Sequence, residues 1–290
     1  MTSPATLIKQ ITVDDGISVF YREAGSPTAP KILLLHGFPT SSFQYRNLIT
    51  RLAEKYHVLA PDFPGFGFTE VPEERKYKYT FDNLTKTLTA WIDALKLTKY
   101  AIYIFDYGSP TGLRVALQRP QAITAIITQN GNAYEEGLGP FWDTIRKFWV
   151  DPATERAGFL KLFTSFETTK SQYVLGAPDP TAIPPETYHL DYYLINRPGN
   201  PEIQVDIMFD YQNNVKLYPT FHKYFREYNP PTLAVWGKTD PFFVPAGAEA
   251  YKRDNPKAEV KFLDAGHFPL ESHNDEIADL ILAFLAKHNI

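Results

Sequence analysis

The sequence predicts an α/β protein with a mostly parallel central sheet, helices on both faces and an inserted helical segment. Short apolar runs typical of strands alternate with amphipathic stretches typical of helices, in the first half of the chain and again near its C-terminus. Between these parts lies a long stretch without clear buried strands. Strands that alternate with helices form parallel sheets covered on both sides. With 290 residues, 44% of them apolar, the chain suits one large core with an insertion.

The first half contains six strand-like runs. The first two flank Asp14-Asp15-Gly16, which is a strong hairpin signal. The predicted strands are residues 8–13, 17–23, 31–35, 57–60, 100–105 and 122–128. A helix is predicted over residues 81–95, and a second helix from about Pro110. In the first of these, one face carries Leu84, Leu88, Trp91, Ile92 and Leu95.

The segment 132–228 differs from the rest of the chain. Its amphipathic aromatic stretches, such as 141–150 and 157–166, are separated by Pro-rich loops such as 177–185. We therefore predict a helical insertion at 132–228 between two parts of one core, residues 1–131 and 229–290. The alternation resumes after the insertion, with predicted strands at 232–236 and 259–263 and predicted helices at 246–253 and 274–287.

Composition excludes several classes of function. The chain has no cysteine, so disulfides, thiolate catalysis and thiolate metal sites are ruled out. The net charge of −4, without a basic stripe, argues against nucleic acid as a partner. Residues 1–7 lack a signal pattern, and no apolar run reaches membrane-spanning length. We expect a cytoplasmic protein without membrane contact, either a monomer or a homodimer.

Asp106 is the most informative residue, because it follows a strand-like run and precedes the small residues Gly108 and Ser109. This strand–turn–helix context is that of a nucleophile elbow, which holds one side chain in a strained, exposed position above a sheet. A serine there would indicate an esterase, whereas a carboxylate can attack an sp3 carbon and form an ester. Asp-x-Gly alone is usually a simple turn. The preceding strand favours the nucleophile.

Three further motifs lie at the ends of predicted strands, where partners of Asp106 are expected. In residues 36–39, His-Gly-Phe-Pro, the N–H of Phe38 would form an oxyanion hole with the N–H of Tyr107. Asp240 offers a carboxylate, although it could also cap the following helix. His267 offers an imidazole in an Ala-Gly-His setting. The order nucleophile, acid, histidine matches one known triad arrangement.

The whole chain resembles an α/β-hydrolase with a helical cap, and specifically an epoxide hydrolase. The motifs that carry this resemblance are residues 36–39, 62–67, 105–109, 236–240 and 266–267. Together and in this order they are specific to the fold, whereas each alone is weak. Among the families of this fold, an aspartate nucleophile is typical of epoxide hydrolases and dehalogenases.

The resemblance implies that two cap tyrosines donate hydrogen bonds to the epoxide oxygen. Tyr211 matches one of them by position, although Gln212 stands where the family pattern has an arginine. Tyr173 is the best match for the other, with Tyr192 and Tyr193 as rivals.

The resemblance also implies the reaction, hydrolysis of a small apolar epoxide to a vicinal diol. Asp106 would form an alkyl ester, which water activated by His267 and Asp240 would hydrolyse. Phe38 and Trp142 are expected to contact the substrate. No metal or cofactor is expected.

Two alternatives stay open. A dehalogenase would use the same ester but needs halide donors. Haloalkane dehalogenases usually carry tryptophan where this chain has Tyr107, and many carry asparagine where it has Phe38. Haloacetate dehalogenases carry an arginine in place of Tyr107. Trp142 or Trp149 could still donate an indole N–H. A non-catalytic small-ligand receptor on the same fold is the second alternative, and the complete nucleophile–acid–base set argues against it.

Overall fold

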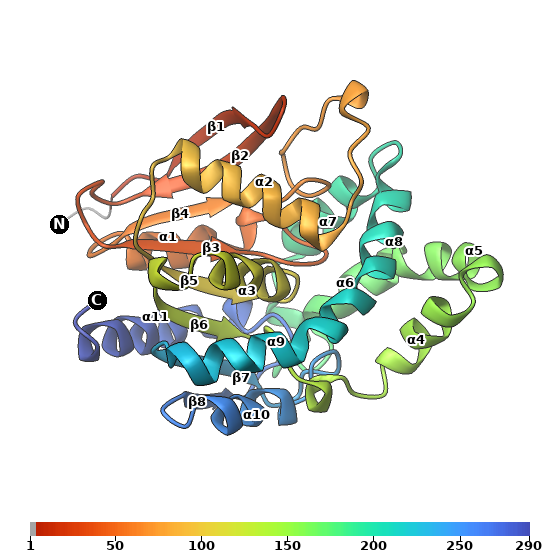
Figure 1. Ribbon diagram of the computed structural model, residues 1–290. Helices are drawn as coiled ribbons and strands as arrows, with labels where there is room; N and C mark the ends of the chain where they lie inside the picture. Colours follow the sequence, from red (N-terminus) through yellow and green to blue (C-terminus); the bar gives the residue numbers. More distant parts are fainter. Residues whose placement is uncertain (1–3) are drawn as a thin grey trace.

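A computed structural model describes residues 4–290 and contains an eight-stranded sheet with helices on both faces (Figure 1). The strand order is β1-β2-β4-β3-β5-β6-β7-β8. Neighbouring strands from β4 to β8 pair in parallel, whereas β1, β2 and β4 pair antiparallel. The strands are β1 (Leu7–Val13), β2 (Ile17–Ala24), β3 (Lys31–Leu35), β4 (His57–Pro61), β5 (Tyr100–Phe105), β6 (Ile123–Gln129), β7 (Thr232–Gly237) and β8 (Glu259–Leu263).

Successive side chains of a strand point to opposite faces of the sheet, so each face packs against its own layer of helices. In β5, Ile102 and Ile104 point into one apolar cluster, whereas Ala101 and Tyr103 point into the other. The first cluster contains side chains of α2 (Phe81–Ala94), α3 (Gly108–Gln118) and α10 (Ala246–Asp254). The second contains side chains of α1 (Arg46–Leu52) and α11 (Leu270–Lys287). Because β5 is buried on both faces, its sequence is a continuous apolar run.

Six helices lie between β6 and β7, within the segment that we call the cap (residues 132–228). They are α4 (Trp142–Val150), α5 (Pro152–Phe163), α6 (Phe166–Val174), α7 (Pro185–Ile195), α8 (Asn200–Asp210) and α9 (Gln212–Tyr228). Short 3-10 turns occur at Ser42–Tyr45, Glu73–Arg75, Pro120–Ala122, Glu135–Gly137 and Pro180–Ala182. In Figure 1 the cap helices α4, α5 and α8 lie to one side of the sheet.

The predicted strands and most helices agree with the structure to within one or two residues. The stretch 157–166 is different, because it covers the end of α5 and the start of α6. Ser165 separates the two helices and caps α6 by accepting from the N–H of Thr168 at 3.1 Å. Helix α11 starts at Leu270, four residues before the predicted start, and contains a non-helical residue at His273.

The cap is joined to the core by buried polar contacts. Arg114 of α3 donates to the side chain of Asn214 of α9 at 2.6 Å and to that of Asp82 of α2 at 2.8 Å. Gln204 of α8 donates to the carbonyl of Gly65 at 2.9 Å. Arg114 therefore ties α9 to the core helix α3, and Gln204 ties α8 to the loop after β4.

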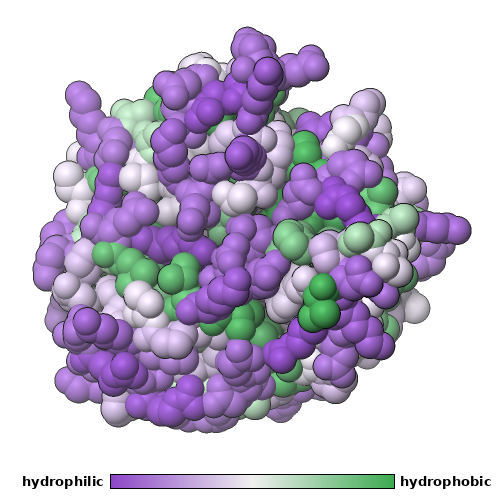
Figure 2. Space-filling view, turned by 45° about the vertical axis from the view of Figure 1, so that its right-hand side comes forward, coloured by the Kyte–Doolittle hydropathy of each residue, from purple (hydrophilic) through white to green (hydrophobic). Residues whose placement is uncertain are grey.

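The surface turned to the viewer in Figure 2 is mostly hydrophilic, with apolar groups in separate patches. Large apolar side chains exposed on the cap include Phe141, Val150, Leu162, Leu175 and Tyr193. Within residues 4–290, no helix is both long and apolar enough to cross a membrane.

Candidate active site

Asp106 lies at the tight turn between β5 and α3. Its φ of 47° places it in the left-handed region, which is unusual for a side-chain-bearing residue. Gly108 permits this turn, because a Cβ there would lie 2.0 Å from the carbonyl oxygen of Leu35. The backbone therefore holds the carboxylate at the carboxyl end of the central strand, as a nucleophile elbow does.

Two backbone N–H groups face the Asp106 carboxylate. Phe38 donates to Oδ1 at 2.6 Å, and the N–H of Tyr107, the residue after Asp106, also lowers the pKa of this carboxyl. Gly37 allows this close approach, because a Cβ there would lie 2.2 Å from Oδ1. Burial raises the pKa of Asp106 to about 6, although the charge of His267 and the two N–H groups lower it. The carboxylate thus lies at the loop that presents the N–H of Phe38, which the sequence predicts as part of an oxyanion hole.

His267 lies on the other side of the carboxylate. Its Nδ1 is 2.8 Å from Oδ2 of Asp240, and its Nε2 is 3.8 Å from Oδ2 of Asp106. Within residues 4–290, Nε2 has no hydrogen-bond partner. Burial lowers the pKa of His267. The carboxylates of Asp240 and Asp106 raise it by more, so the pKa lies above its ordinary value. A neutral ring held by Asp240 would direct the Nε2 lone pair at a water beside Asp106.

Asp240 is itself firmly held. The side chain of Asn130 donates to Oδ2 at 2.6 Å, and the backbone N–H groups of Phe242 and Phe243 donate to Oδ1 at 2.8 and 3.2 Å. Asp240 therefore both orients His267 and organises the turn after β7. The alternative of a helix cap is wrong, because α10 begins at Ala246 and its N-cap is Pro245, with no side-chain cap bond.

The loops around the site are fixed by two buried side chains. His36 accepts from the N–H of Phe63 through Nε2 at 2.9 Å, and burial lowers the pKa of His36 to about 3, so the ring is neutral. Asp62 accepts from the N–H groups of Ser42 and Phe68 at 2.7 and 2.8 Å. His36 thus holds the loop that presents Phe38.

Tyr211 lies in an aromatic cluster that includes Tyr107, the residue after Asp106. Its ring centroid is 5.9 Å from that of Tyr107 and 4.6 Å from that of Trp142. Burial and the charge of Asp106 raise the pKa of Tyr211. The phenol is therefore neutral at pH 7 and close enough to Asp106 to interact with its charge.

Tyr173 lies elsewhere, in the apolar cluster on the α11 side of the sheet. Its ring stacks on Phe268 with centroids 3.9 Å apart, and its hydroxyl donates to the carboxyl of Asp191. Because a phenol has one proton, Tyr173 would have to leave Asp191 before it could donate to a substrate. Its role as the second donor stays a prediction. Its rival Tyr193 is 69% exposed.

The tryptophans of the cap use their indole N–H groups within the protein. Trp142 donates to the carbonyl of Phe242 at 2.7 Å, and Trp149 donates to the carbonyl of Met208 at 2.9 Å. Trp142 therefore contributes an apolar face beside Tyr211. Phe38, the other expected substrate contact, stacks on Phe163 with centroids 4.2 Å apart.

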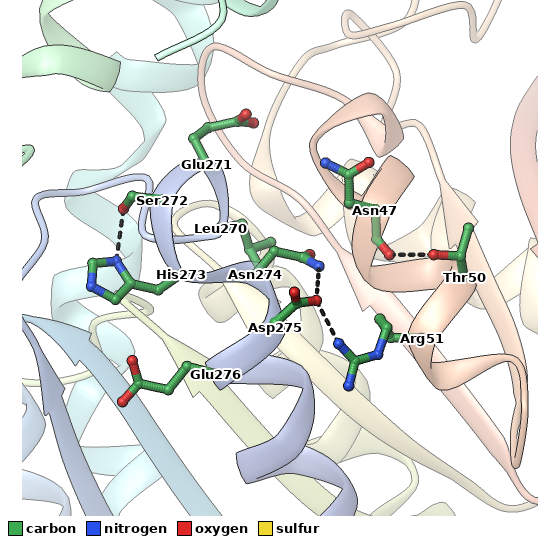
Figure 3. A pocket seen from close by; sticks show the side chains of 10 residues that line it. All are labelled: Asn47, Thr50, Arg51, Leu270, Glu271, Ser272, His273, Asn274, Asp275 and Glu276. Carbon is green, nitrogen blue, oxygen red and sulfur yellow. Dashed lines mark hydrogen bonds and ion pairs between the residues drawn. The ribbon is translucent and has the colours of Figure 1, made fainter. Parts of the chain in front are cut away.

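A separate surface pocket lies between α1 and the start of α11 (Figure 3). Arg51 and Asp275 form an ion pair across it, and Ser272 bonds to His273 at its edge. None of the residues that line it belongs to the group around Asp106. Within residues 4–290, no cluster of three His, Cys, Asp or Glu side chains is arranged to hold a metal ion.

A family model for the alpha/beta hydrolase fold matches residues 30–165 and 193–274. The chain belongs to this family. The match covers both parts of the core, including Asp106, Asp240 and His267, together with much of the cap.

Curated relatives of this hydrolase extend over nearly its whole length. It is 47% identical over 283 residues to an uncharacterized hydrolase of Saccharomyces cerevisiae, covering 96% of this chain and 97% of that protein. It is 26% identical over 281 residues to a haloalkane dehalogenase of Mycolicibacterium paratuberculosis, covering 92% and 87%. A crystal structure of a haloalkane dehalogenase variant from Bradyrhizobium elkanii superimposes with a TM-score of 0.78 at 21% identity, covering 98% of both chains. That likeness concerns the fold alone.

Several polar residues of the hydrolase site were not found from its sequence. Asn130 and Asn132 directly follow β6, and their position at a strand end was an available signal. Tyr218, whose hydroxyl is 3.4 Å from that of Tyr211, had no distinguishing local pattern. The same holds for Asp191, the partner of Tyr173.

Proposed function

We propose that this hydrolase converts small apolar epoxides to vicinal diols through an ester on Asp106. The observation that carries the proposal is a buried carboxylate at the elbow, with the unpartnered Nε2 of His267 3.8 Å from it. A carboxylate nucleophile needs no base to activate it, so the histidine is free to act on water.

In the first step an oxygen of Asp106 forms a bond to a ring carbon of the epoxide, and the C–O bond of the ring breaks. The electron pair of that bond passes to the ring oxygen. Tyr211 stabilises this developing alkoxide through its hydroxyl and gives it a proton, which the phenolate recovers from water. Phenols suit this role because they donate and yet are neutral at pH 7.

In the second step His267 takes a proton from water through Nε2, and the hydroxide attacks the carboxyl carbon of Asp106. The N–H groups of Phe38 and Tyr107 stabilise the oxyanion of the tetrahedral intermediate. This intermediate collapses by breaking the bond to the alkyl oxygen, which takes the proton from the imidazolium. The products are the diol and the carboxylic acid of Asp106, which loses its proton to solvent; that proton neutralises the hydroxide left when Tyr211 was reprotonated.

The competing function is dehalogenation, which the named haloalkane dehalogenase relative favours. That reaction needs donors for a leaving halide. The indole N–H groups of Trp142 and Trp149 already donate to backbone carbonyls. Their engagement supports the epoxide over the haloalkane as substrate.

The test is a panel of aryl epoxides, alkyl epoxides and haloalkanes, scored for diol and for halide, with Asp106→Ala as the inactive control. We expect diol from epoxides and little halide. Halide release that exceeds diol formation would favour the dehalogenase. Tight binding without either product would favour a receptor.

A further inference from the structure

We propose that Tyr218, oriented by Asn132, is a positioning residue that fixes the Tyr211 hydroxyl as a donor to the substrate oxygen. The inference rests on the proposed epoxide hydrolysis. It concerns three side chains that are at most 1% exposed, Asn132, Tyr211 and Tyr218. Buried polar groups satisfy their hydrogen-bonding capacity within the protein, so the direction of each bond can be worked out.

The series of hydrogen bonds begins at Asn132, whose amide orientation is fixed by Tyr134. The carbonyl oxygen of Tyr134 lies 2.7 Å from Nδ2 of Asn132, and a carbonyl can only accept. On the other side of the amide, Oδ1 accepts from the N–H of Tyr134 at 3.4 Å. Asn132 therefore presents an N–H to the Tyr218 hydroxyl, which lies 3.2 Å from Nδ2.

Tyr218 continues the same direction of donation toward Tyr211. Its oxygen accepts from Asn132, and either hydroxyl could donate in its contact with Tyr211; in the proposed relay the donated proton is that of Tyr218. The Tyr211 oxygen, 3.4 Å away, is the other polar atom bonded to it. This separation is long for a bond between hydroxyls. Hydrogen bonds of catalytic groups are often long without substrate and shorten in the reacting complex.

Tyr211 is the last residue in this series of hydrogen bonds. Its oxygen accepts from Tyr218, so its proton is left to point away from Tyr218. Its ring is in contact range of Tyr107, the residue next to the nucleophile, and the charge of Asp106 acts on its hydroxyl. A hydroxyl that accepts one hydrogen bond is a better donor in the next. The relay thus directs and strengthens the donor that the ring oxygen needs.

The experiment measures single-turnover ester formation from an epoxide that the parent protein hydrolyses. All variants carry His267→Gln, so ester formation is the only chemical step observed. Tyr218→Phe should slow it about three- to tenfold, the range for loss of one neutral hydrogen bond. Tyr224→Phe is the matched control, because Tyr224 lies on the same helix, is buried, and has a hydroxyl without a partner within residues 4–290. It should leave the rate within about twofold.

A double-mutant cycle separates positioning from general damage. Since Tyr218 acts through Tyr211, adding Tyr218→Phe to Tyr211→Phe should cause no further loss. Additive losses, or a wild-type rate in Tyr218→Phe, would overturn the relay. If Tyr211→Phe slows ester formation while Tyr218→Phe does not, only the relay fails. If the parent protein makes no diol from any epoxide, the proposed function fails.

Discussion

At the scale of single residues, the reaction places opposite demands on two buried groups. Asp106 must be ionised to attack, and His267 must be neutral to take a proton from water. Burial raises the pKa of Asp106 to about 6, which leaves the carboxylate ionised at pH 7. The two groups are only 3.8 Å apart, so their titrations are coupled.

The ester-forming step should depend on pH through Asp106. Below about pH 6 its rate constant should fall about tenfold per pH unit, because only the carboxylate attacks. In His267→Gln the midpoint should move to higher pH, because the charge of His267 lowers the pKa of Asp106. Single-turnover rates from pH 5 to 8 measure both. A pH-independent rate would contradict the role of Asp106.

His267→Gln should trap the ester, because the water loses its base while the nucleophile is intact. Intact-protein mass spectrometry should then show an adduct equal to the full mass of the epoxide. A haloalkane would add its mass less that of the hydrogen halide, so the same spectrum separates the two functions. His273→Gln is the control, since His273 contacts Ser272 and not the site, and should accumulate no adduct. Absence of an adduct in His267→Gln would refute the two-step scheme.

The meeting of Asp106, Asp240, His267 and Phe38 at one place could be predicted, because each follows a strand in a short motif that carries its own local geometry. Their catalytic roles stay a prediction. Asp191 and Tyr218 could not, because helical cap residues acquire their partners only through tertiary packing. Tyr173 illustrates the limit. Its position along the cap suggested a substrate donor, whereas its hydroxyl contacts a carboxyl contributed by the next helix.

At the scale of elements, α6 and α7 are joined through a buried acid. Asp191 of α7 is 0% exposed and accepts from Tyr173 of α6. Burial raises the pKa of Asp191 to about 8, although hydrogen bonds from Tyr173 and Thr40 lower it. The folded protein therefore holds a proton on Asp191 over a range in which the unfolded chain has released it.

This difference predicts a pH-dependent stability. The folded-state pKa of Asp191 lies above its unfolded value of about 4. The stabilising contribution is therefore complete below about pH 4 and is lost as pH rises to about 8, by at most ~1.4 kcal/mol per pH unit. Asp191→Asn, which is neutral throughout, should gain stability relative to wild type between pH 5 and pH 7.5.

Urea unfolding at these two pH values measures the effect. Asp143→Asn, on an exposed position of α4, is the control and should follow wild type. Parallel profiles for wild type and Asp191→Asn would show that Asp191 does not hold the extra proton.

Helix boundaries show what local sequence encodes. Helix α2 could be predicted because four turns of apolar periodicity precede a clear end. Helix α1 was not predicted, because seven residues give too few repeats to reveal a period. The stretch 157–166 was taken as one amphipathic unit because its apolar spacing continues across the break at Ser165.

At the scale of the whole molecule, Arg114 links the cap to the core. It is 5% exposed and donates to Asp82, to Asn214 and to the carbonyl of Pro110. Arg114→Met retains much of the apolar stem but removes the donor from the buried Oδ1 of Asn214, and should cost about 1–3 kcal/mol in the free energy of unfolding.

Arg119→Met is the matched control, because Arg119 pairs with Asp93 near the surface, and it should cost less than about 1 kcal/mol. Urea unfolding followed by tryptophan fluorescence measures both variants, since the chain has tryptophans in the cap and in the core. Equal losses of unfolding free energy in the two variants would show that the buried contacts of Arg114 stabilise the protein no more than a surface ion pair.

The sheet as a class could be predicted from the alternation of strands and helices, but its strand order could not. Placement of β4 between β2 and β3 depends on contacts between segments distant in sequence, which local patterns do not encode. The arrangement of the cap over the site depends on contacts of the same kind, such as that between Gln204 and Gly65.

The short segment 130–134 after β6 contacts two other parts of the molecule, the turn after β7 and helix α9. Asn130 holds the acid Asp240, Asn132 holds Tyr218, and the carbonyl and N–H of Tyr134 hold Asn132. For protein engineering this sets where the chain can be spliced. A chimera that receives the cap of another hydrolase should retain residues 130–134 of its host, with the junction after Tyr134. A junction at residue 130 would exchange the support of the acid along with the cap.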